Sequence, residues 1–253
     1  MVKLLTTALG ESASDYMLKG GHWILIILTL IACIGVFVWQ FRTSRYQAIP
    51  YWSAVAGVAV FGTIAADAVV HAGVPIPVVA VAYAAVTAFV LTLWRRSEGT
   101  LSVHSITTRR REKFYWLTVM ATFSLGTAVG DLTADTLGLG FLGSIVLFSI
   151  AIVIPWMLHR RGYLHPVAAF WASYALTRPL GASVADWLGK PVHDDGYGGG
   201  GLGLGEGPVT LGGIALFVVL VAYLAIKRPD VQETIEVTEP SPPGLPSNAV
   251  RPR

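Results

Sequence analysis

The chain has 253 residues, of which 54% are hydrophobic and 13% are charged, and its formal net charge is +3. Soluble domains carry about 25% charged residues, so this composition excludes an ordinary soluble protein and indicates a chain that spans a membrane several times. The basic residues stand in short connectors between apolar runs, which favours a membrane topology signal over nucleic-acid binding. A single cysteine, Cys33, excludes a disulfide within the chain and a cysteine metal site.

Eight apolar segments follow one another along the chain, and each approaches or exceeds the roughly 20 residues that a helix needs to cross the hydrocarbon. They are residues 2–18, 22–41, 51–72, 75–94, 114–135, 140–158, 166–188 and 208–226. In lipid, only a helix satisfies every backbone group within a single segment. We therefore expect an all-α membrane protein with eight transmembrane helices, of which the first is the least hydrophobic.

Lysine and arginine concentrate in every second connector. With eight spans, 15 of the 18 basic residues fall on one face together with both termini. Lys19 and Lys190 fall on the other face, and Arg178 lies inside a span. By the positive-inside rule the basic face is cytoplasmic, so the sequence predicts a multi-pass protein with both termini in the cytoplasm.

Two connectors and the tail differ in composition from the apolar segments. The connector "RRSEGTLSVHSITTRRREK" is basic, and it is interpreted either as a loop that sets the topology or as a contact for anionic lipid headgroups. The connector "GKPVHDDGYGGGGLGLGEGP" is glycine-rich, and it is interpreted either as a flexible link or as a lid or re-entrant element. The tail, residues 229–253, is rich in proline and polar residues and is expected to be disordered.

One short pattern recurs in every odd-numbered segment: a glycine, three residues, a small residue and an aspartate. Its copies are "GESASD" (10–15), "GTIAAD" (62–67), "GTAVGD" (126–131) and "GASVAD" (181–186). The repeat unit is therefore interpreted as a two-helix hairpin used four times in parallel orientation. The four repeats cover about residues 1–41, 50–94, 114–158 and 166–228.

A second landmark accompanies the last three copies, because an aromatic–tryptophan pair places Trp52, Trp116 and Trp171 ten residues before the glycine. These tryptophans are interpreted as interfacial anchors. The first copy has no room for the pair, so we expect either a shortened first helix or a true start upstream of Met1.

The spacing within the pattern suggests two roles. The glycine and the small residue lie four positions apart on one helix face, which lets membrane helices approach closely. The expected packing positions are Gly10, Gly62, Gly126 and Gly181. A carboxylate inside a membrane costs about 2.5–3.5 kcal/mol on insertion scales, so the acids need partners or a function. The candidate ion- or proton-binding residues are Asp15, Asp67, Asp131, Asp186, Glu11 and Asp135, with Arg178 as a buried countercharge.

Oxygen ligands without sulfur suit a hard cation such as Mg²⁺, Mn²⁺ or Ca²⁺, and Asp131 with Asp135 is the best candidate pair. Without a metal, clustered carboxylates share protons. The sequence therefore favours a transporter of a small cation, either a divalent metal or one coupled to protons. In the alternative, a non-transporting scaffold or accessory subunit, the aspartates only lock helix packing, as Lys19 and Lys190 at i+4 favour for two of the four.

No zinc-peptidase, serine-hydrolase or phosphate-loop motif is present, so neither an enzyme nor a cofactor is expected. The four glycine–aspartate elements resemble a bacterial family, as do "LWRRSEGTLSVHSITTRRRE", "GDLTADTLGLG" and "FWASYALTRPLGASVADWLGKP". This is the family of uncharacterised membrane-anchored proteins, integral membrane proteins built from four copies of a repeat of unknown function.

The resemblance covers about residues 3–228 and implies the topology, the repeat number and a bacterial inner membrane, without catalytic residues. The chain departs from the family at its short N-terminus and in the "VHDDGYGGGG" insertion.

Overall fold

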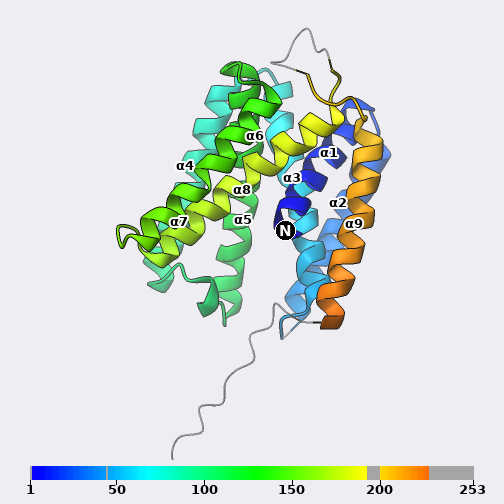
Figure 1. Ribbon diagram of the computed structural model, residues 1–253. Helices are drawn as coiled ribbons and strands as arrows, with labels where there is room; N and C mark the ends of the chain where they lie inside the picture. Colours follow the sequence, from blue (N-terminus) through cyan, green and yellow to red (C-terminus); the bar gives the residue numbers. More distant parts are fainter. Residues whose placement is uncertain (1, 44, 193–199, 228–253) are drawn as a thin grey trace, which may run out of the picture.

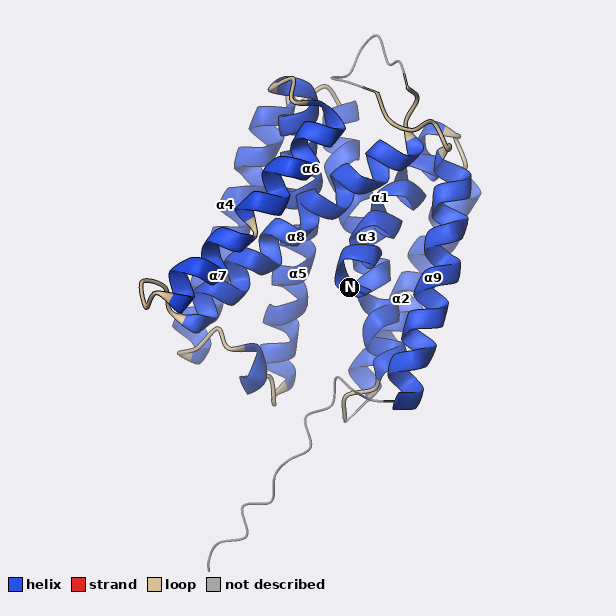
Figure 2. Cartoon of the chain, in the orientation of Figure 1, coloured by secondary structure: helices blue, strands red, loops and turns tan. Residues whose placement is uncertain are grey.

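The computed structural model describes residues 2–43, 45–192 and 200–227, and this part of the chain folds into helices and their connections (Figures 1 and 2). The helices are α1 (Val2–Lys19), α2 (Trp23–Arg42), α3 (Ala48–His71), α4 (Ile76–Glu98), η1 (Val103–Ser105), α5 (Arg109–Asp131), η2 (Leu132–Thr136), α6 (Gly140–Ala151), α7 (Val153–Arg160), α8 (Pro166–Gly189) and α9 (Glu206–Lys227). The tail for which disorder is expected, and the centre of the glycine-rich connector, lie outside the described residues.

Six helical stretches of the described chain are long and apolar enough to cross a membrane. They are α2, α3, α4, α5 continued by η2, α6 continued by α7, and α9. The protein is therefore a multi-pass membrane protein. Two of the eight expected spans, α1 and α8, are long enough, with 18 and 24 residues, but they are too polar to be among these six, and charged residues such as Glu11 and Arg178 interrupt their apolar sequences.

Two local irregularities divide the expected segments. Pro155 has no backbone N–H to donate to the carbonyl of Ala151, and the helix breaks at this turn into α6 and α7. At the end of α5, the residues from Leu132 to Thr136 form one π-helical turn. Such turns often occur at functional sites, and this one directly follows Asp131.

Four helices, α1, α3, α5 and α8, contact one another in a closed ring in that order, with α8 against α1. The other helices surround the ring: α2 packs on α3, α4 on α5, α6 and α7 on α8, and α9 on α1 (Figure 1). Each outer helix thus packs chiefly on the next helix of the ring, rather than on the ring helix that precedes it in the chain. Of the apolar stretch of α2, 6% of the residues are buried, against 67% in α5 with η2, so the outer helices present most of their apolar side chains to lipid.

The four pattern glycines lie at the four interfaces of the ring. Each contacts the residue three positions before the glycine of the next ring helix. The contacts are Gly10 with Ala59, Gly62 with Phe123, Gly126 with Arg178 and Gly181 with Thr7. A Cβ added at the first, second or fourth glycine would lie 2.5–2.6 Å from the Cβ of its neighbour. The helices therefore approach closely only because these positions lack a side chain.

Aromatic side chains fill one end of the ring. Trp94, Tyr115, Trp116, Trp171 and Tyr174 are buried in one hydrophobic cluster. Trp116 and Trp171 are 5% and 6% exposed, and the indole Nε1 of Trp171 donates a hydrogen bond to the carbonyl of Leu101 at 2.9 Å. These two tryptophans pack inside the bundle, so the expectation that they face lipid as interfacial anchors is wrong.

Candidate functional site

Carboxylates from five helices gather where the ring helices meet. We call the following six residues the central acidic cluster: Glu11 and Asp15 of α1, Asp67 of α3, Asp131 of α5, Asp186 of α8 and Glu206 of α9. Four of them are the aspartates of the recurring pattern, and Glu11 precedes the first of these by one helical turn. The ring therefore brings together five of the six acids that the sequence indicates, although they are far apart along the chain.

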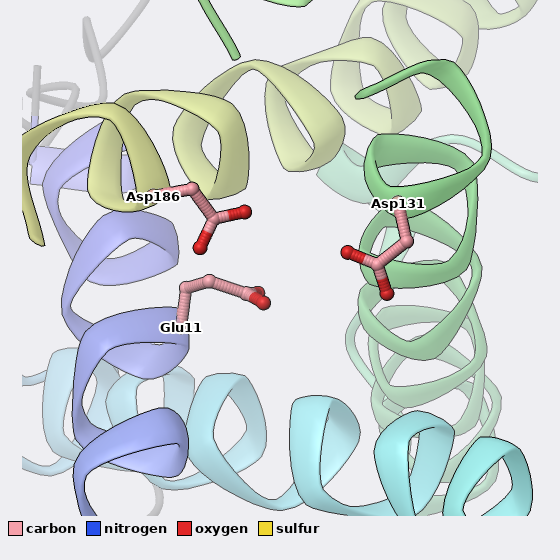
Figure 3. Close-up of side chains that lie close together, drawn as sticks. All are labelled: Glu11, Asp131 and Asp186. Carbon is pink, nitrogen blue, oxygen red and sulfur yellow. The ribbon is translucent and has the colours of Figure 1, made fainter. Parts of the chain in front are cut away.

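Two groups of three acids are compact. One carboxylate oxygen from each of Glu11, Asp131 and Asp186 lies within 4.8 Å of the other two, and the three side chains extend toward one common space (Figure 3). The same limit holds for Asp15, Asp186 and Glu206. Asp186 belongs to both groups and so connects them.

Glu11 is buried, with 3% of its surface exposed. Its Oε2 accepts hydrogen bonds from Thr63 Oγ1 at 3.2 Å and from Thr127 Oγ1 at 3.0 Å, and the two hydroxyl oxygens are 3.1 Å apart. Glu11, Thr63 and Thr127 each stand four residues before a pattern aspartate. Equivalent positions of α1, α3 and α5 therefore meet around one carboxylate.

Two lysines pair with part of the cluster. Lys19 Nζ is 2.8 Å from Asp15 Oδ2, and Lys190 Nζ is 2.8 Å from Asp186 Oδ1 and 3.8 Å from Asp15 Oδ2. Lys190 therefore bridges α8 and α1 and is largely buried, whereas the side chain of Lys19 is 54% exposed. Asp131 forms no ion pair and no side-chain hydrogen bond within the described residues.

Sequence reasoning missed Glu206. Both of its carboxylate oxygens are buried without a hydrogen-bond partner in the described chain. The side chain lies over Gly189, where an added Cβ would stand 2.6 Å from Oε2. The available signal was a lone acid in the first turn of the last apolar helix, but the glycine-rich connector before it suggested only a link or a lid.

The remaining candidates lie elsewhere. Asp135 stands on the π-helical turn and is in neither compact group of three acids. Arg178 is fully buried, but no acid among the described residues pairs with it. Its guanidinium donates to Thr7 Oγ1 at 3.2 Å and Tyr174 Oη at 2.6 Å, and lies 3.2 Å from the centre of the Phe123 ring. The ion pairs that the sequence led us to expect from Arg178 are made by Lys19 and Lys190.

A family model described as Repeat of Unknown Function (DUF347) matches residues 114–161 and again residues 169–229. The first match holds most of α5 together with α6 and α7, and the second holds most of α8 together with α9, so each matched stretch contains one ring helix and one pattern aspartate. The resemblance to a repeat family of unknown function is thereby confirmed. No curated protein and no solved structure matches this chain.

Proposed function

We propose that this protein binds a small cation, either a divalent metal or protons, at the central acidic cluster and carries it across the membrane. The supporting observation is the charge balance of the cluster. It holds six carboxylates, and the described residues supply Lys19 and Lys190 as their ion-pair partners. Ionisable groups buried in a membrane protein are costly and mark ion or proton paths. A bound cation, or shared protons, would relieve the repulsion among the carboxylates that Lys19 and Lys190 do not neutralise.

The ligand chemistry supports a hard cation. Glu11, Asp131 and Asp186 offer oxygen atoms within 4.8 Å of one another. Ca²⁺ binds oxygen at about 2.3–2.6 Å, so ligands on opposite sides of it are about 4.6–5.2 Å apart, whereas Mg²⁺ requires about 4.0–4.2 Å. Because 4.8 Å is an upper limit on these separations, the three acids suit a hard divalent cation without distinguishing Ca²⁺ from Mg²⁺.

The two sides of the cluster differ in access. Lys19 is largely exposed beside Asp15, so the cluster reaches the surface there. Beyond Glu11 stands the buried guanidinium of Arg178, eight residues and about 12 Å before Asp186 along α8. A cation moving past Glu11 would meet this positive charge. We infer that the arrangement is open toward Lys19 and closed at Arg178, and that transport requires movement of Arg178.

We also propose that all four ring helices belong to copies of one repeat in parallel orientation, over about residues 1–41, 50–94, 114–158 and 166–228. Two of these ranges match the family model. The other two carry the same glycine–aspartate pattern, and each pattern glycine meets the same register position of the next helix. One unit repeated four times explains why the ring closes with α8 against α1.

We propose in addition that both termini face the cytoplasm of a bacterial inner membrane, because the basic connectors then lie inside. Fusion of a reporter that is active on one side of the membrane to the C-terminus and to the α2–α3 connector tests this. Both fusions are expected to report the cytoplasmic side, and a periplasmic signal from either would contradict the assignment.

A non-transporting scaffold is the second candidate, and specific contacts favour it. Lys190 ties α8 to α1, and the hydroxyls of Thr63 and Thr127 tie α3 and α5 to Glu11. These bonds join all four ring helices, as a purely structural network would. The scaffold does not account for Asp131 and Glu206, whose carboxylates add charge without adding a bond among the described residues.

Flux through reconstituted liposomes separates the two candidates. The vesicles carry dyes for Ca²⁺, Mn²⁺, Mg²⁺ and protons, and the wild-type protein is compared with Asp131→Asn and with Glu98→Gln, an acid on α4 outside the cluster. We expect flux of at least one cation in the wild type and in Glu98→Gln, and none in Asp131→Asn. Absence of all flux in folded wild-type protein would support the scaffold instead.

A further inference from the structure

A second site lies at the aromatic end of the ring. A cavity of about 840 Å³ opens among the beginning of α1, the α2–α3 connection, the segment from Val103 to Arg109, and the beginnings of α5 and α8. Tyr51 and Tyr115 line it sixteen residues before Asp67 and Asp131, which is about 24 Å along each helix. The cavity is therefore separate from the central acidic cluster, and its volume is typical of small-molecule sites.

The charge in this cavity is positive. Lys3, Arg45 and Arg109 line it, against the single acid Glu112. Arg109 Nη1 pairs with Glu112 Oε2 at 2.9 Å, which neutralises both. Lys3 Nζ donates to the carbonyl of Tyr174 at 3.1 Å and lies 2.9 Å from the centre of the Tyr174 ring, but no acid of the described chain pairs with it. The amino group of Lys3 thus stands at an aromatic wall without a negative partner.

Hydrogen-bond donors accompany this charge. The indole Nε1 atoms of Trp52 and Trp116, two residues that line the cavity, are buried without an acceptor in the described chain. A buried donor without an acceptor costs about 1–3 kcal/mol, so two in one wall call for an explanation. Flat rings complete the lining, among them Tyr51 and Phe170. The cavity therefore combines the basic group of Lys3 and planar apolar surface with two indole donors in its wall that have no acceptor in the described chain.

We propose that this cavity binds a small organic anion: a carboxylate carried on a planar, apolar body. The carboxylate pairs with the ammonium of Lys3, the indole donors of Trp52 and Trp116 supply hydrogen bonds, and the body stacks on the aromatic wall. Recognition depends on the negative charge as well as on the apolar surface. The site does not depend on the function proposed for the central acidic cluster.

Calorimetric titration of the detergent-purified protein with 1-naphthoate tests this, with the neutral 1-naphthamide as matched ligand and protein-free micelles as blank. We expect saturable binding of naphthoate and at least about tenfold weaker binding of the amide. Loss of a charge-assisted hydrogen bond costs about 1.5–3 kcal/mol, so Lys3→Gln should weaken naphthoate binding about 10- to 100-fold. Lys3→Arg, which keeps the charge, should retain binding to within about fivefold.

Two controls make the result specific. Arg96→Gln removes an exposed positive charge at the end of α4 and should leave naphthoate affinity unchanged. Asp131→Asn should also leave it unchanged, so failure of the cation proposal and failure of this one are distinguishable. Equal affinity for acid and amide, equal losses in Lys3→Gln and Arg96→Gln, or no saturable binding of naphthoate to the wild type would each overturn the proposal.

Discussion

Neutralising Asp131 gives the sharpest test of what the buried acids do. In a network that only locks helices, an acid changed to its amide weakens a bond and lowers stability. Asp131 has no ion pair and no side-chain hydrogen bond in the described chain, and its carboxylate lies within 4.8 Å of those of Glu11 and Asp186. Asp131→Asn therefore removes negative charge from a crowded site and breaks no bond that the structure shows.

The magnitude follows from Coulomb's law. Two unit charges no more than 4.8 Å apart repel by at least about 3.5 kcal/mol at an effective dielectric constant of about 20. Lys190 attracts Asp131 and offsets part of this repulsion, and bound protons or cations would offset more of it. We therefore expect cation-free Asp131→Asn to be at least as stable as the wild type.

Asp131→Asn should, by contrast, lose the increase in thermal stability that a bound cation gives the wild type. A ligand present at 100 times its Kd stabilises the folded state by about 2.7 kcal/mol, which corresponds to a rise in Tm of roughly 5–10 °C for a chain of this size. Thermal unfolding in detergent, with Ca²⁺, Mn²⁺ or Mg²⁺ in separate samples, should show this rise for the wild type and for Glu98→Gln, but not for Asp131→Asn. A variant that is less stable without cations and keeps the wild-type response would refute the reasoning.

Three further predictions concern the packing of the ring. Gly62→Ala should lower the unfolding free energy by about 1–3 kcal/mol, because its Cβ would stand 2.6 Å from the Cβ of Phe123. Gly35→Ala on α2 is the control, because no atom lies within 4 Å of its Cβ, and it should leave stability unchanged or raise it. Equal losses in the two variants would argue against close packing. Lys190→Met should lower the unfolding free energy, measured in urea or by heating, by about 3–5 kcal/mol, because it leaves Asp186 and Asp15 without the lysine that joins them. Lys19→Met should lower it by less than about 1 kcal/mol, because Lys19 is largely exposed. The reverse order would contradict the difference in burial between the two lysines. Glu11→Ala should be less stable than Glu11→Gln by about 1–3 kcal/mol, because only glutamine keeps an acceptor for Thr63 and Thr127, and equal stabilities would show that these hydrogen bonds contribute nothing.

Several features of the fold follow from local sequence. Apolar length predicted residues 22–41 and 208–226 as helices, which the structure places at Trp23–Arg42 and Glu206–Lys227. The recurring pattern indicated four of the acids that come together in the central acidic cluster, since it marks equivalent turns of four helices. Each signal lies within a short stretch of sequence, so it can be recognised without knowing which helices are neighbours.

Other features depend on neighbours that the sequence does not specify. The π-helical turn after Asp131 is a local distortion within an apolar segment that looks continuous, whereas the break at Ile152 has a local cause in Pro155. Glu206 was missed because its significance arises only where α9 meets α1, close to Asp15. The aromatic cavity is lined by residues of the recurring aromatic–tryptophan pairs, but only the fold brings these pairs together with Lys3 of α1.

The sequence by itself determined the helices, the membrane class and the acids that four helices present at one level, because hydrophobic length and helical periodicity are properties of short segments. The tertiary structure alone decided that α1 and α8 lie within the ring and that each outer helix packs on the next ring helix. It also decided that Lys190 reaches Asp15 of α1, while Arg178 pairs with no acid of the described chain. The physical reason is that helix neighbours are selected by close packing at glycine contacts and by the pairing of buried charges. Both depend on distances between segments that are far apart in the chain.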